Sequence, residues 1–155
     1  MKRASPNLFT SNLCEIEIQY HNKVKSSEMP KISCSKDAEA ILREVWSDKI
    51  EYVEEFMVLC LNRSNKVLGW ALISMGGQHG TVADPKVIFQ IALKANASNI
   101  ILAHNHPSGT IEPSSADISL TNKIKSAGEY LDLTVLDHII LSSESYYSFG
   151  DDGKL

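Results

Sequence analysis

The chain has 155 residues, of which 43% are apolar, and a formal net charge of −4. This length is that of one globular domain with a full hydrophobic core, and the apolar content excludes a chain that stays disordered. The acidic balance gives no overall electrostatic attraction to nucleic acid, which leaves only a local basic patch to consider.

The sequence also indicates the compartment. No apolar run approaches the roughly 18 residues that a membrane helix needs, and the first residues hold no apolar stretch typical of a signal peptide. The three cysteines, Cys14, Cys34 and Cys60, are an odd number without CxxC spacing, which favours reduced thiols. We therefore expect a cytoplasmic protein that has no contact with membranes.

Residues 1–35 predict a lead ahead of the main domain, which we assign to residues 36–155. Residues 1–13 are polar and carry no periodicity. Glu15–Tyr20 alternates polar and apolar residues and predicts an edge strand with one wet face, while 21–35 form a predicted linker. The open edge of such a strand would allow a homodimer.

Three helices are expected in the main domain. They run from Lys36 to about Trp46, from Asp84-Pro85 to residues 96–99, and from Ser114 to about Tyr130. Asp84-Pro85 is the strongest of these starts, because Asp caps a helix and Pro suits the first helical position. Ser35 is the expected N-cap of the first helix. The expected buried stripe of the third helix consists of Leu120, Ile124, Ala127 and Leu131.

Strands alternate with these helices. The expected strands are Phe56–Leu61, Val67–Ser74, Ile100–Ala103, Leu133–Leu141 and Tyr146–Phe149. A turn cluster at residues 62–66 joins the first two strands as a hairpin. The third strand is apolar throughout, which is typical of burial on both faces, so we place it centrally. Because hairpins and crossovers both occur, the sequence predicts an α/β domain with a mixed sheet.

A polar cluster directly follows the predicted central strand. His104 and His106 are one residue apart, so in an extended segment their side chains point the same way. Asp117 follows beyond a Pro/Gly turn, where the chain can fold back. Two histidines and one carboxylate, with a fourth position for water, are the ligand set of a catalytic zinc. We therefore predict one Zn²⁺ per chain, held by His104, His106 and Asp117.

Each of these residues also has a structural interpretation. The histidines are compatible with an ordinary loop. The segment Ser114-Ser115-Ala116-Asp117 matches a capping box, in which the Asp117 carboxylate would serve the helix N-terminus instead of a metal. We favour ligation by Asp117, because the histidines otherwise lack a third protein ligand nearby. Ser114 is either an N-cap alone or a residue of the site as well.

The pattern His104-x-His106, seven residues, Ser114, two residues, Asp117 resembles the JAMM motif of JAB/MPN metalloproteases. The amino-acid sequences of segments 104–109 and 112–117 more closely resemble those of the bacterial RadC family. The resemblance covers roughly residues 36–153 and also includes Glu54-Glu55-Phe56, Gly80-Thr81 before Asp84-Pro85, and the segment 136–140. Full-length RadC proteins carry a helix-hairpin-helix region ahead of this domain. We expect this chain to lack it, since residues 1–35 do not match one.

This resemblance implies a three-layer α/β/α JAB/MPN domain with a cytidine-deaminase-like fold. It also implies a JAMM-type zinc metallopeptidase or isopeptidase, which cleaves an amide bond of a protein or peptide substrate with metal-activated water. In the family, the catalytic glutamate lies two positions before the strand aromatic, which assigns the general base to Glu54 rather than Glu55. Taken alone, such a pair of glutamates predicts solvated surface charges, and it is the resemblance that reverses this interpretation. The motif serine, Ser114, would help to stabilise the oxyanion.

A function of another class is also compatible with the sequence. The RadC name implies DNA repair, so the alternative is a DNA-repair-associated or protein-interaction module with little or no hydrolase activity. The net charge of −4 makes DNA binding the weaker hypothesis. Asp137-His138 interrupts an apolar strand and is either a hydrogen-bonded structural pair or support for the metal site. We expect His79, in the glycine-rich loop at residues 76–80, to be exposed.

Overall fold

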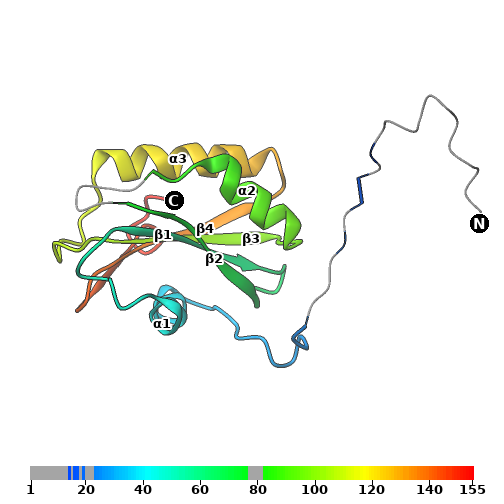
Figure 1. Ribbon diagram of the computed structural model, residues 1–155, viewed down its shortest axis with the longest axis horizontal. Helices are drawn as coiled ribbons and strands as arrows, with labels where there is room; N and C mark the ends of the chain where they lie inside the picture. Colours follow the sequence, from blue (N-terminus) through cyan, green and yellow to red (C-terminus); the bar gives the residue numbers. More distant parts are fainter. Residues whose placement is uncertain (1–13, 15, 18, 20–22, 77–81) are drawn as a thin grey trace, which may run out of the picture.

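Figure 1 shows the protein as a computed structural model, which describes residues 14, 16, 17, 19, 23–76 and 82–155. In chain order the elements are α1 (Ser35–Val45), β1 (Glu55–Leu61), β2 (Val67–Met75), α2 (Pro85–Lys94), β3 (Asn99–Asn105), α3 (Ser115–Glu129), β4 (Thr134–Leu141) and β5 (Tyr146–Ser148). Within these residues, no helix combines the length and apolar character that crossing a membrane requires.

In the described part of the chain, five strands form one mixed sheet in the order β2-β1-β3-β4-β5. β1 pairs antiparallel with both β2 and β3, β3 runs parallel to β4, and β4 pairs antiparallel with β5. The β1–β2 hairpin and the central place of β3 confirm the sequence predictions. Because β3 and β4 are parallel, α3 crosses over one face of the sheet between them.

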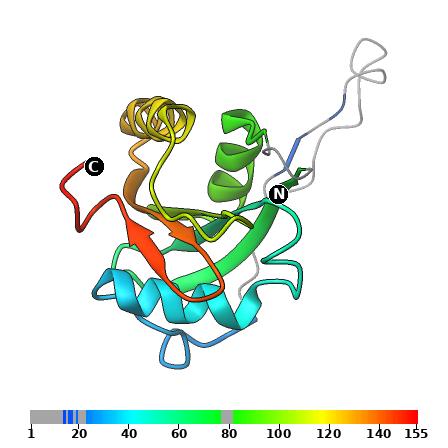
Figure 2. The same ribbon diagram turned by 90° about the vertical axis from the view of Figure 1, so that its left-hand side faces the viewer.

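The sheet lies between two helical layers. Figure 2 shows α1 on one face and α2 and α3 on the other. Successive residues of β3 serve opposite layers: Ile100 and Leu102 belong to the core under α2 and α3, whereas Ile101 and Ala103 belong to the core under α1. Both faces of β3 are therefore buried, which explains its apolar sequence without alternation. The predicted three-layer α/β/α fold is confirmed.

The starts of two helices differ in how well the sequence predicts them. Asp84 caps α2 as expected, and its carboxylate accepts a hydrogen bond from the N–H of Lys86 (2.9 Å). The prediction that Ser35 caps α1 is wrong, because the cap is Cys34 and Ser35 is already helical. The carboxylate of Asp37 reaches back to the N–H of Cys34 (3.3 Å) and thereby starts the helix one residue earlier.

The predicted buried stripe of α3 is confirmed for Ile124, and Leu120 and Ala127 pack against the same core, but the prediction is wrong for Leu131. Leu131 is 42% exposed, whereas the buried residues of the helix are Thr121, Ile124 and Gly128. A Cβ at position 128 would lie 2.3 Å from the carbonyl oxygen of Leu133, so only glycine allows the helix to approach the start of β4 this closely. The close approach turns Gly128 inward and leaves Leu131 at the surface.

The strand expected at residues 15–20 falls partly outside the described residues. Those that are described there, at positions 16, 17 and 19, are exposed and belong to no strand. Further along, Met29 and Ile32 are buried, and the N–H of Ile32 donates to the carbonyl of Asn65 (2.9 Å). The chain thus packs against the β1–β2 turn before α1 begins, and the assignment of residues 1–35 to a separate lead stays a prediction.

Candidate metal centre

The end of β3 and the first turn of α3 bring three potential metal ligands together. Nε2 of His104 lies 2.9 Å from Nε2 of His106 and 3.3 Å from Oδ1 of Asp117. The ligand atoms of the three residues all lie within 4.8 Å of one another. The His104 side chain is 1% exposed, while those of His106 and Asp117 are 17% and 15% exposed. The predicted ligands therefore form one cluster that solvent reaches from one side.

Hydrogen bonds at the end of the sheet fix the loop that carries these ligands. The N–H of His106 donates to the carbonyl of Leu141 at the end of β4 (2.9 Å), which extends the strand pairing beyond β3. The chain then turns through Gly109, whose φ of +83° lies in the region that favours glycine. After this turn Ser114 starts α3, and the first helical turn carries Asp117 back to the histidines.

His106 offers an unprotonated nitrogen to the cluster when its ring is neutral. Nδ1 lies 2.7 Å from the carbonyl of Thr110, and because a carbonyl only accepts, Nδ1 holds the proton and Nε2 is bare. The nearby carboxylate of Asp117 and, to a lesser extent, the charge of Glu54 raise the pKa of His106. Burial opposes charge on Asp117, yet His104 and His106 hold the pKa of its carboxyl well below its usual range. The cluster thus attracts a cation.

This donor set fits a zinc ion. Two imidazole nitrogens and a carboxylate converge at separations of 2.9, 3.3 and 3.7 Å. Lone pairs at such separations repel one another, and a metal ion among them would remove that repulsion. Zinc binds histidine nitrogen and carboxylate oxygen at about 2.0–2.2 Å, and three protein ligands leave its fourth position open. His104, His106 and Asp117 are the residues that would hold it.

The carboxylate of Asp117 serves the helix and the cluster at the same time. Its Oδ2 accepts hydrogen bonds from the N–H and the hydroxyl of Ser114, at 2.7 and 2.6 Å, and Ser114 Oγ accepts from the N–H of Asp117 (3.2 Å). Its Oδ1 is the oxygen nearer to His104. The capping box and a place in the cluster, which the sequence set against each other, are therefore compatible: Oδ1 faces His104, while Oδ2, which serves the cap, also lies 3.7 Å from Nε2 of His106.

We expect Asp117→Asn and Ser114→Ala to separate these two roles. Asn keeps an acceptor oxygen for the cap but loses the charge, so zinc affinity should fall by roughly 100-fold or more. The free energy of unfolding of the metal-free Asn variant should change by less than about 1 kcal/mol. Ser114→Ala keeps the carboxylate and should lower the unfolding free energy by about 1 kcal/mol, with zinc affinity within about tenfold.

Zinc competition against a chromophoric chelator and urea denaturation of the metal-free proteins would measure the two quantities separately. Equal losses of zinc affinity in Asp117→Asn and Ser114→Ala would contradict the separation between the helix-capping role and the metal-binding role of the Asp117 carboxylate.

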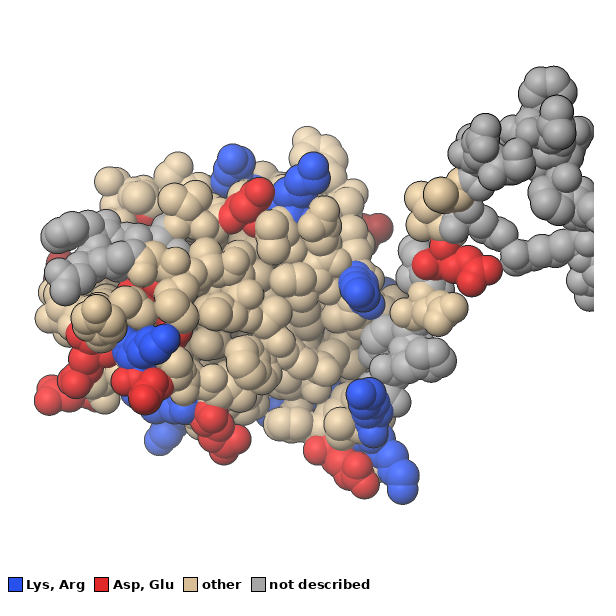
Figure 3. Space-filling view, in the orientation of Figure 1, with Lys and Arg blue, Asp and Glu red and all other residues tan. Residues whose placement is uncertain are grey.

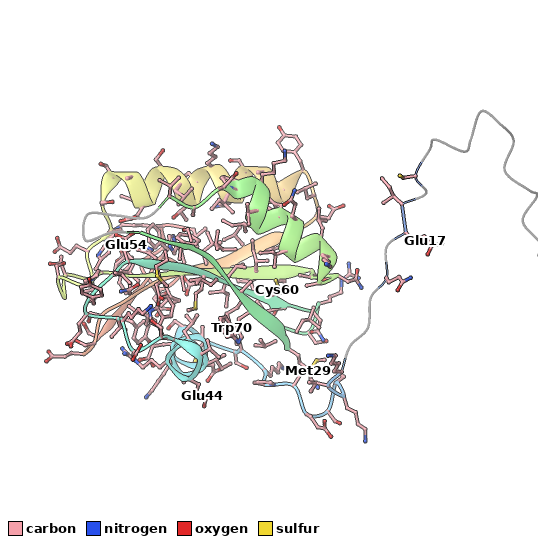
Figure 4. All side chains as sticks on the ribbon, viewed as in Figure 1. Glu17, Met29, Glu44, Glu54, Cys60 and Trp70 are labelled. Carbon is pink, nitrogen blue, oxygen red and sulfur yellow. The ribbon has the colours of Figure 1, made fainter. Side chains whose placement is uncertain are left out.

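Two adjacent glutamates stand at the start of β1, and they face opposite sides of the sheet. Phe56 pairs in register with His104, and their rings are stacked with centroids 5.9 Å apart. Glu54 precedes Phe56 by two residues and therefore shares its side of the chain. Figure 4 shows Glu54 at the end of the sheet where α3 starts. Glu55 is 1% exposed and accepts a hydrogen bond from the Ser47 hydroxyl (2.8 Å). The geometry favours Glu54 as the group near the cluster.

Asn105, between the two histidines, holds the segment that carries Glu54. Its side chain points away from the cluster and is fully buried. Oδ1 accepts from the N–H of Glu55 (2.7 Å), and Nδ2 donates to the carbonyls of Ile50 and Val53 at 2.7 and 2.9 Å. The end of β3 therefore fixes both the histidines and the backbone beside Glu54.

The two adjacent polar residues of β4 have different roles: His138 contacts the cluster, and Asp137 is structural. Nε2 of His138 lies 2.8 Å from Nδ1 of His104, and burial holds the pKa of His138 well below its ordinary value. Asp137 points elsewhere and accepts hydrogen bonds from the Ser148 hydroxyl (2.6 Å) and the N–H of Gly150 (2.8 Å). Burial raises the pKa of Asp137 although these hydrogen bonds act in the opposite direction.

Sequence reasoning missed Thr121, whose hydroxyl oxygen lies 2.6 Å from Nδ1 of His138. Its position four residues after Asp117 puts both on one face of α3, which is the one signal that points to it. His79 and most of the glycine-rich loop, at residues 77–81, lie outside the described part of the chain.

A three-layer α/β/α domain with two histidines at the end of its central strand, and an aspartate on the first turn of the following helix, is a JAB/MPN domain of the JAMM type. Comparison with protein families agrees with this class. The chain belongs to the RadC family, because the family model described as "RadC-like JAB domain" matches residues 32–154.

Curated relatives support the same membership. A UPF0758 protein of Flavobacterium johnsoniae is 47% identical over 126 residues, which are 81% of this chain and 54% of the relative. A UPF0758 protein of Porphyromonas gingivalis is 37% identical over 140 residues, 89% of this chain and 62% of the relative. The chain spans about half the length of the curated relatives it matches. Their shared name states no activity.

Proposed function

We propose that the domain is a zinc-dependent hydrolase of the JAMM type that cleaves amide or isopeptide bonds. The observation that carries the proposal is the convergence of His104, His106 and Asp117 on the side of the sheet that Glu54 shares. Two imidazoles and one carboxylate form an open set of three ligands, which is typical of catalytic and not of structural zinc.

The residues around the cluster supply distinct functions to such a reaction. Zinc bound by the three ligands would lower the pKa of water to about 7 and polarise the substrate carbonyl. Glu54 accepts a proton from the attacking water and delivers it to the nitrogen of the leaving amine. The hydroxyl of Ser114, beside the cluster through its contact with Asp117, turns to donate to the oxygen that becomes negative as the carbonyl is attacked.

We propose a protein or peptide as the substrate. The net charge is −4, and on the face in Figure 3 the Lys and Arg side chains are interspersed with Asp and Glu around an uncharged centre. Such a face gives little support for a phosphate-binding surface, which requires clustered basic residues. The chemistry of the cluster instead favours a carbonyl substrate.

Metal removal and restoration would test this function. Protein purified without chelator should cleave some member of a panel that contains unfolded proteins, short peptides and peptides joined through lysine side chains. Chelation should abolish the cleavage, and one equivalent of zinc should restore it. Zinc-loaded protein that cleaves no member of the panel would contradict the proposal, and salt-dependent binding to DNA in the same sample would favour the DNA-associated alternative.

A further inference from the structure

Three buried polar side chains form a continuous chain of hydrogen bonds behind the candidate metal centre. They are Thr121 of α3, His138 of β4 and His104 of β3, with exposed fractions of 1%, 0% and 1%. The Thr121 hydroxyl oxygen lies 2.6 Å from Nδ1 of His138, and Nε2 of His138 lies 2.8 Å from Nδ1 of His104. Two hydrogen bonds thus link α3 to β4 and β4 to β3, and the second of them ends at His104, one of the proposed metal ligands.

The direction of these hydrogen bonds follows from the first proton. The Thr121 hydroxyl also lies 2.6 Å from the backbone carbonyl of Asp117, which can only accept, so the hydroxyl proton goes there. Thr121 Oγ1 must then accept from Nδ1–H of His138. In a neutral His138 ring this leaves Nε2 bare, and Nε2 accepts from Nδ1–H of His104. The remaining nitrogen of His104, Nε2, is consequently bare and faces the cluster.

Aromatic packing keeps the His138 ring in this orientation. Its ring stacks on Phe149 with centroids 4.9 Å apart and planes 13° apart, and Phe56 lies 5.5 Å away on a tilted plane. The carbonyl of His138 also accepts from the N–H of Phe149 (3.0 Å). A 180° flip of the ring would put carbon atoms where its two nitrogens lie and would break both polar contacts in a site that water does not reach.

We propose that Thr121 and His138 are positioning residues that fix the tautomer of His104, so that its bare Nε2 is directed to the metal ion. The inference rests on the proposed function in so far as zinc is the ion bound. A histidine ligand must present an unprotonated nitrogen, and the partner of its other nitrogen decides which nitrogen that is. Here that partner is a second histidine, and its own tautomer is set by a hydroxyl on the helix that carries the third ligand.

The tautomer itself is measurable without metal and without activity. Nitrogen-15 NMR of the metal-free protein, at a pH where the imidazoles are neutral, distinguishes a protonated ring nitrogen from a bare one. We expect His104 to be protonated at Nδ1 and His138 also at Nδ1. A proton found on Nε2 of His104 in the wild type would overturn the proposal. The expected tautomers in a protein that binds no zinc would support the proposal and contradict the proposed function.

Zinc affinity then tests what the hydrogen-bond chain contributes. Thr121→Val keeps the volume but removes the acceptor for His138, so the proton can move to the other His138 nitrogen and displace that of His104 onto Nε2. We expect zinc to bind about 10–100-fold more weakly, with Thr121→Ser close to wild type. His138→Phe should weaken binding to a similar extent, while His138→Gln, which retains an acceptor oxygen for His104, should recover most of the loss.

Ser148→Ala is the matched control for the loss of a buried hydroxyl. Ser148 is 5% exposed and donates to Asp137 (2.6 Å), the residue beside His138. The Ala variant should unfold more easily, with its zinc affinity and its His104 tautomer unchanged. If Thr121→Val lowers only stability, as this control does, and leaves zinc affinity and the tautomer unaltered, Thr121 is merely structural and the proposal fails.

Discussion

Replacing Glu54 with Gln should slow amide-bond hydrolysis by about 10²–10⁴-fold while zinc stays bound. The Gln side chain occupies the same space but has no carboxylate to take the proton of the attacking water. Glu54 shares the side of β1 on which Phe56 stacks against His104, so its removal affects proton transfer without touching a ligand. Initial rates on any substrate found in the peptide panel, together with zinc content, would measure both effects.

Glu55→Gln is the matched control, because it removes the same charge from the adjacent residue. Glu55 is buried on the opposite side, against the Ser47 hydroxyl, and Gln retains an acceptor oxygen for that hydrogen bond. Its turnover should remain within a few-fold of wild type, a change well below the 10²-fold minimum attributed to a general base. Loss of turnover in Glu55→Gln with normal rates in Glu54→Gln would reverse the assignment.

The double variant His104→Ala/His106→Ala should bind no zinc, whereas the wild type should carry about one ion per chain. Both Nε2 atoms line the cluster, and Asp117 alone cannot hold the ion. Zinc at 100 times its dissociation constant should stabilise the wild type by about 2.7 kcal/mol and leave the double variant unaffected. Elemental analysis and thermal unfolding with and without zinc would measure these two differences.

Zinc bound by exposed thiols would add to the zinc content measured in this experiment. Cys14 and Cys34 are both exposed, and free thiolates bind zinc. A Cys14→Ser/Cys34→Ser variant should therefore keep its stoichiometric zinc. Retention of one ion by the double histidine variant, and its loss from the serine variant, would place the metal elsewhere and contradict the assigned ligands.

The parts of the fold that follow local rules could be predicted from the sequence. Asp84-Pro85 starts a helix because both residues suit its first positions, and the apolar strand at 100–103 lies centrally because both of its faces need cover. The start of α1 was missed by one residue, because the deciding group is the Asp37 carboxylate, not the Ser35 hydroxyl. Such a competition between neighbouring polar groups depends on geometry that a residue pattern does not contain.

The candidate site shows the same limit over longer distances. Its three predicted ligands have a short, restrictive spacing, so the sequence indicates them as a group. Thr121 and His138 carry no such spacing, and a threonine in place of an apolar residue on the buried face of α3 appears only as an interruption of the stripe. The roles of Asp117 looked exclusive in the sequence, because the pattern does not show that its two oxygens point to different partners.

The parallel connection β3–α3–β4 has a consequence for how the proposed activity would be inherited. His104, His106, Asp117, Thr121 and His138 all come from this single stretch of chain, residues 99–141, whereas Glu54 comes from the segment ahead of β1. The three proposed metal ligands and the proposed general base are thus encoded in separate segments. A descendant, or a designed domain that borrows the β3–α3–β4 unit without the glutamate, would keep a loaded metal centre and serve as a scaffold instead of an enzyme.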